Sequence, residues 1–71
     1  MWVIIKCNNI VEGPLHQDRD AFKIMRLTIE HGISNVFYTD DLNEAHRKEM
    51  QWIQGIYNET LVEYRQLCES F

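Results

Sequence analysis

Residues 42–71, LNEAHRKEMQWIQGIYNETLVEYRQLCESF, decide the fold of this chain. On a helical wheel the large apolar side chains of this stretch lie within about 100° of Leu42, and only Val62 points away. The apolar side is formed by Ala45, Trp52, Ile53, Ile56, Tyr57, Leu61, Tyr64, Leu67, Cys68 and Phe71. The opposite side carries Glu44, Arg47, Lys48, Gln51, Asn58, Arg65 and Glu69. A stripe that stays in phase over this length predicts one long amphipathic C-terminal helix.

Such a helix is longer than the body on which it must pack. It spans about 45 Å at 1.5 Å per residue, whereas a compact domain of this length has a radius of gyration of about 11 Å. Either the helix breaks, near Gly55 or at Asn58, or another chain covers its distal stripe. The glycine favours a break by about 1 kcal/mol, whereas each large side chain buried against a partner contributes about 1.5–3 kcal/mol.

The N-terminal segment predicts a hairpin. Residues 2–7, WVIIKC, are mostly apolar and β-branched, and they end at Asn8-Asn9, a pair that tolerates the positive φ of a tight turn. We expect a short second strand at Ile10-Val11, which stops at Gly13-Pro14 because proline cannot donate to the ladder. A plain strand that runs into a loop is the alternative.

A helix and a third strand are expected next. Over residues 18–31 one broad face is apolar, and the pattern has helical rather than strand period. We expect Asp18 to cap this helix and Gly32 to follow its end. Residues 35–39 are β-branched and aromatic, as in a strand, and Asp41 is expected to start the long helix in a capping box with Glu44. The apolar face of the first helix consists of Ala21, Phe22, Ile24, Met25, Leu27, Thr28 and Ile29.

These elements together predict an α+β fold. A ββαβ unit over residues 1–39, a three-stranded sheet with one packed helix, precedes the long helix over residues 40–71. At 71 residues we expect one domain, whose stability is marginal because a chain of this size buries only about 60% of its unfolded surface.

The charge distribution argues against nucleic acid as a ligand. The net charge is −4, and the excess lies in residues 36–71, which hold three basic and seven acidic residues. A nucleic-acid binder needs a basic face to neutralise phosphates, and neither half of the sequence supplies one. No apolar run is long enough to span a membrane, and no basic region or cleavage site marks a signal peptide. We therefore expect a cytoplasmic chain in which Cys7 and Cys68 are reduced thiols.

The residues that could carry chemistry do not form a recognisable pattern. His16, His31 and His46 lack the closely spaced ligand pairs of zinc sites, so we expect no metal and no cofactor. Ser34 and Ser70 lie in no nucleophile motif, and Asp40-Asp41 is typical of a helix start. The sequence therefore predicts a protein that is not an enzyme.

Residues 2–39 resemble a pattern of small phage and prophage accessory proteins. The similarity lies in the Asn8-Asn9 turn, the Gly13-Pro14-Leu15 segment, in which Leu15 stands where the pattern has an aromatic, a helix that contains Ala21, then Gly32 and residues 36–38. The resemblance implies a ββαβ fold and a phage origin, and it brings no catalytic residues with it.

Together these observations predict a binding protein. We expect it to dock on a host or phage protein and to inhibit or redirect it, as in host takeover or anti-defence, because aromatic side chains dominate binding hot spots. The alternatives are a self-associating homodimer in which the long helices pair, or an accessory of a transcription regulator. The expected interface comprises Trp52, Ile56, Tyr57, Tyr64, Leu67 and Phe71, and the acidic surface comprises Glu59, Glu63 and Glu69.

Overall fold

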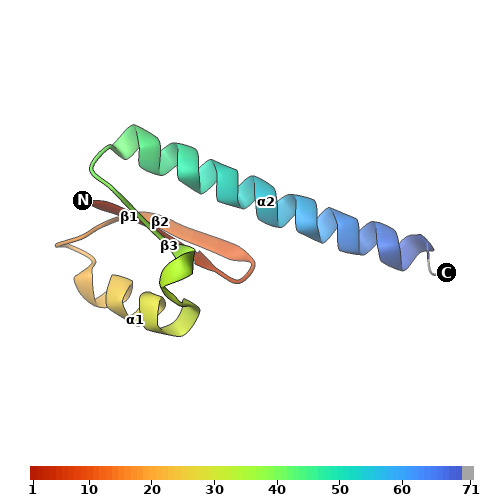
Figure 1. Cartoon of the computed structure of the whole chain (residues 1–71), viewed down its shortest axis with the longest axis horizontal. Helices are drawn as coiled ribbons and strands as arrows, with labels where there is room; N and C mark the ends of the chain where they lie inside the picture. The colour runs from red at the N-terminus through yellow and green to blue at the C-terminus, as the bar shows by residue number, and fades with distance from the viewer. Residues whose placement is uncertain (70–71) are drawn as a thin grey trace.

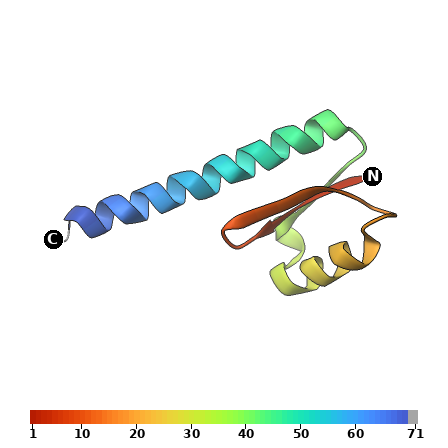
Figure 2. The ribbon, with the colours of Figure 1, turned by 180° about the vertical axis from the view of Figure 1, so that it is seen from behind.

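A computed structural model describes residues 1–69 of the chain, except for the side chains of Tyr64 and of residues 67–69. Its strands form one antiparallel sheet in the order β2-β1-β3, with α1 on one face and α2 on the other (Figures 1 and 2). The predicted α+β architecture is confirmed. The elements are β1 (Trp2–Cys7), β2 (Ile10–His16), α1 (Ala21–His31), the 3-10 turn η1 (Ile33–Asn35), β3 (Val36–Thr39) and α2 (Leu42–Glu69).

The β1–β2 hairpin turns at Asn8-Asn9, as the sequence predicts. Cys7 pairs with Ile10, and Asn8 takes a φ of 57°. The second strand does not stop at proline, however. It continues to His16 through a cis Gly13–Pro14 bond, with an irregular register opposite Ile4. One residue of such an irregularity is left unpaired, so β2 can continue although Pro14 has no N–H to donate to the ladder.

Gly13 is required at this irregularity. Its φ of 137° is rarely adopted by residues with a side chain, and a Cβ there would lie 2.7 Å from Ile4 Cδ1 and 2.8 Å from the Val3 carbonyl oxygen. The glycine therefore lets β2 lie directly against β1.

The two faces of the sheet are buried by different helices. Successive strand residues point to opposite faces, so Val3, Ile5 and Cys7 pack with Ile24 and Leu27 of α1. On the other face Ile4 and Ala45 of α2 are fully buried. The sheet is thus the middle of three layers (Figure 1).

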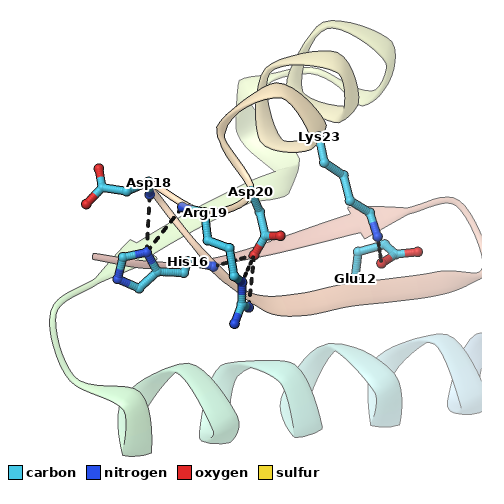
Figure 3. Close-up of polar contacts among 6 residues, drawn as sticks. All are labelled: Glu12, His16, Asp18, Arg19, Asp20 and Lys23. Atoms are coloured by element: carbon cyan, nitrogen blue, oxygen red, sulfur yellow. Dashed lines mark hydrogen bonds and ion pairs between the residues drawn. The ribbon is translucent and has the colours of Figure 1, made fainter.

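The corner between β2 and α1 is held by polar contacts (Figure 3). α1 begins at Ala21, so the expectation that Asp18 caps it is wrong. The Asp20 carboxylate instead accepts a hydrogen bond from the His16 backbone N–H at 2.9 Å and pairs with Arg19 at 3.0 Å. These contacts, the backbone hydrogen bond first, lower the pKa of Asp20 below its ordinary 3.8. The backbone N–H groups of Asp18 and Arg19 donate in turn to His16 Nδ1.

The ends of the helices follow the sequence in part. Gly32, with a φ of 86°, directly follows the last residue of α1 as expected. At the start of α2 the Asp41 carboxylate accepts from the Asn43 N–H. The Asp41 N–H donates to the Thr39 hydroxyl rather than to Glu44. Asp41 therefore caps the helix through the Asn43 N–H alone, and the expected capping box with Glu44 does not form.

α2 runs without interruption from Leu42 to Glu69. The helix is not broken near Gly55 or at Asn58, the first of the two outcomes considered from the sequence. Its length gives the molecule extents of 50 × 25 × 16 Å and a radius of gyration of 14.4 Å, well above the value of about 11 Å for a compact domain of this size. In both ribbon views the free end of α2 extends beyond the sheet (Figures 1 and 2).

Candidate protein-interaction surfaces

The first half of α2 is anchored to the sheet. Lys48 Nζ lies 5.2 Å from the ring centroid of Phe37 on β3 and 5.2 Å from that of Trp52 on α2 itself. Cation–π contacts of this kind contribute about 0.5–1 kcal/mol at exposed sites. Trp52 and Ile56 are half-buried. Both were predicted to lie in an interface, and here they belong to the anchored half of the helix.

The second half of α2 projects as an arm, which we define as residues 57–69. From Tyr57 onward every described side chain except the half-buried Leu61 is exposed. Tyr57 is 61% and Val62 53% exposed, and Ile53, just before the arm, is also exposed. Exposed large apolar side chains grouped on one element are typical of binding surfaces.

Acidic side chains border the apolar ones on this arm. Asn58, Glu59, Val62 and Glu63 line a shallow hollow of about 390 Å³. Glu59 and Glu63 are exposed as predicted, whereas Val62, the one apolar residue outside the predicted stripe, lies between them. The remaining predicted residues fall outside the description: Phe71 entirely, and Tyr64, Leu67 and Glu69 in their side chains.

A second apolar surface, which the sequence did not predict as exposed, lies on the other side of the sheet. Phe22, Met25 and Ile29 of α1 are 85%, 56% and 78% exposed, and Tyr38 of β3 is partly exposed beside them. These four residues form what we call the α1–β3 surface. The sequence signal was present, since all three helix residues belong to the predicted apolar face. That face is wider than the arc that one sheet can cover, so only Ile24 and Leu27 become buried.

The α1–β3 surface is hollowed between the helix and the edge of the sheet. Its groove has a volume of about 380 Å³, and Tyr38 forms its strand side. The opposite flank of α1 is polar, because Lys23 pairs at 3.1 Å with Glu12 of β2 (Figure 3). α1 therefore turns its charged side toward β2 and its apolar side toward β3. The groove is lined by Gln17, Ala21, Ile24, Met25, Thr28, Ile29 and Tyr38.

The nucleophilic and metal-binding side chains are dispersed. Cys7 is buried, and desolvation, followed by the nearby Glu12 and Glu30 carboxylates, raises the pKa of its thiol, which Lys23 partly offsets. A protonated buried thiol is a poor nucleophile. Within residues 1–69 as described, no three His, Cys, Asp or Glu side chains come together as a metal site would require.

No helix in the described part of the chain combines the length and the apolar character needed to cross a membrane. α2 is long enough, but charged residues occur along its length.

Comparison with protein-family models, curated proteins and solved structures finds no match to this chain. The features of this chain that point to a function are therefore its two exposed apolar surfaces. One lies on the α2 arm and the other along α1 and β3.

Proposed function

We propose that this protein is a binding module that inserts its α2 arm into a groove on another protein. The observation that carries the proposal is that α2 continues past the sheet as a helix, with Tyr57 of its apolar stripe exposed. A helix laid into a groove is a common mode of protein recognition, in which a few apolar anchors supply most of the affinity.

The charge of the arm specifies the chemistry of the partner. Glu59 and Glu63 are exposed beside this stripe, so the complementary groove has an apolar floor that receives Tyr57 and basic side chains along its rim. Such rim charges chiefly accelerate association and select the partner, whereas the apolar anchors determine how long the complex lasts. That binding inhibits or redirects a host or phage protein stays a prediction from the sequence.

The proposal is tested by immobilising the whole chain and exposing it to a bacterial lysate. Wild type and an Ile33→Lys control, changed at an exposed position outside α2 and outside the α1–β3 surface, should retain the same protein. Tyr57→Lys should lose it, and its far-UV circular dichroism should match that of wild type because Tyr57 is exposed.

The acidic rim is tested separately with Glu59→Lys combined with Glu63→Lys. We expect this double variant to bind the retained protein at least about tenfold more weakly at low salt, with a smaller loss at high salt where charges are screened. Retention that survives the Tyr57 substitution, or a lysate from which nothing is retained, would contradict the proposal.

A further inference from the structure

The two edges of the sheet differ in how they are protected. The β2 edge carries Pro14, which cannot donate, next to an irregular register. Proteins commonly use such features to prevent an edge from pairing with another chain. The β3 edge is Val36-Phe37-Tyr38-Thr39, with neither proline, glycine nor charge, and the strand has a partner on one side only, β1. Its outer backbone groups are therefore suited to pair with a further strand.

The apolar flank of α1 lies beside this same edge. Phe22, Met25 and Ile29 are spaced i, i+3 and i+7, so they form a single stripe along the helix, and Tyr38 continues it onto β3. At about 200 Å² for a large side chain, the exposed fractions of these four residues amount to roughly 500 Å². A standard interface buries about 800 Å² per partner, and the β3 edge and its charged flank would add to the area of these four residues.

From these observations we propose that β3 pairs antiparallel with β3 of a second copy of this chain. The dimer then contains a continuous six-stranded sheet, with a two-fold axis perpendicular to it. A rotation about that axis keeps the α1 faces of the two copies on the same side of the joined sheet. α1 therefore meets α1 of the other copy there, and their apolar stripes form the contact. The interface is isologous, as in most homodimers.

Charge on the opposite face selects the register of this pairing. Lys48 lies over Phe37, and together with Glu44 and Arg47 it lines a hollow beside β3. Glu44 precedes Lys48 by about one helical turn, about 6 Å, which matches two strand residues. α2 runs roughly opposite to β3 (Figure 1). With Lys48 over Phe37, one turn back along α2 corresponds to two residues forward along β3, which sets Glu44 near the level of Thr39.

Every symmetric register centred on a residue of β3 preserves the faces of the sheet, and the two central ones, on Phe37 and on Tyr38, differ in which charges meet. A pairing centred on Phe37 would set the Lys48 side chains of the two copies at the same level. A pairing centred on Tyr38 places Phe37 opposite Thr39 of the second copy, so that Lys48 faces Glu44 across the axis in both directions. Like charges in such positions disfavour a pairing and opposite charges favour it, so Tyr38 is the centre.

The self-association is tested by sedimentation equilibrium of the whole chain at tens of micromolar. Wild type should show twice the 8.5 kDa mass of the chain. Met25→Lys and Ile29→Lys should each raise the dimer dissociation constant at least about tenfold, because each change alters both sides of a symmetric interface. Ile10→Lys is the matched control, since Ile10 at the far edge is 59% exposed against 56% for Met25, and it should remain dimeric.

The register is tested by exchanging the charges. Glu44→Lys alone and Lys48→Glu alone place like charges across the axis and should weaken the dimer, whereas the double exchange restores opposite charges and should recover most of the affinity. In the dimer, amides on the outer side of residues 36–39 should also exchange hydrogen more slowly than in the Ile29→Lys variant.

Three results would overturn the proposal. One is a wild-type monomer at these concentrations. A second is a dimer that Met25→Lys and Ile29→Lys leave intact while Tyr57→Lys dissociates it, which would place the contact on the α2 arm. The third is a dimer whose affinity is lower in the double charge exchange than in either single variant, which would exclude the Tyr38-centred register. None of these measurements depends on the partner of the α2 arm. The proposed dimer can therefore be disproved while the proposed function of the arm still holds.

Discussion

Replacing Gly13 with alanine tests the closest backbone approach in the sheet. The new Cβ would lie 2.7 Å from Ile4 Cδ1 and 2.8 Å from the Val3 carbonyl oxygen, closer than real Cβ atoms come to either. Neither neighbour can move easily, because Ile4 and Val3 are both fully buried. The substitution also forces a residue with a side chain to a φ of 137°.

Two separate costs follow from this geometry. A backbone conformation that only glycine adopts freely costs about 1–3 kcal/mol, and inserting a methyl group into a filled site costs about 1–3 kcal/mol more. We therefore expect Gly13→Ala to lower the free energy of unfolding by about 2–5 kcal/mol. At about 0.05–0.15 kcal/mol per residue, the whole chain has about 4–10 kcal/mol to lose.

The other two glycines serve as controls in urea unfolding followed by far-UV circular dichroism. Gly32 has a φ of 86° but open space around it, so Gly32→Ala should show the backbone cost alone, about 1–3 kcal/mol. Gly55 has open space and lies within α2, so Gly55→Ala should stabilise by about 1 kcal/mol. Equal losses for Gly13→Ala and Gly32→Ala would refute the close approach to Ile4, and a loss for Gly55→Ala would refute the continuous helix.

Three further predictions concern the core and the titratable groups. Ile4→Ala should lower the free energy of unfolding by about 2–5 kcal/mol because Ile4 is fully buried, whereas Val62→Ala should change it by less than about 0.5 kcal/mol; equal losses would show that Val62 is not exposed. In a Cys68→Ser background the buried Cys7, whose pKa is raised, should react with a thiol reagent only as fast as the fold opens, and a rate that urea does not increase would contradict this. Because the pKa of Asp20 is lowered from 3.8, its contribution to stability is complete above that pH and is lost as the pH falls toward the folded value. Asp20→Asn should therefore lower the free energy of unfolding at neutral pH and make it depend less on pH in the acid range. An unchanged pH dependence in that range would exclude Asp20 as its source.

The elements of this chain were predictable because their signals are local. The Asn8-Asn9 turn, the glycine after α1 and the in-phase stripe of α2 each depend on a few neighbouring residues, and each predicted element is present. The extension of β2 beyond Pro14 was not predictable in this way. It depends on a register irregularity and on the absence of a side chain at Gly13 opposite Ile4, which are properties of the paired strands.

The surfaces were less predictable than the elements, for a physical reason. Helical periodicity shows that Phe22, Met25 and Ile29 share a face, but not how much of that face the sheet covers. The same limit applies to Trp52, whose contact with Lys48 and half-buried position near the sheet could not be inferred from periodicity; its predicted place in an interface stays a prediction. Length was the more informative signal for α2, because a helix longer than its body must leave one end uncovered.

The anchoring of α2 also determines how its arm comes to be helical. An isolated peptide of about 12–15 residues is at best marginally helical in water, because the first hydrogen-bonded turn is costly to form. The arm, residues 57–69, does not have to form that turn. Contacts of Ala45 and Lys48 with the sheet fix the first turns of α2, and the remaining residues only propagate an existing helix, at one new hydrogen bond per residue. The sheet thus acts as the nucleus for a segment that projects beyond it, so the proposed partner would meet a preformed helix rather than a coil that it must order.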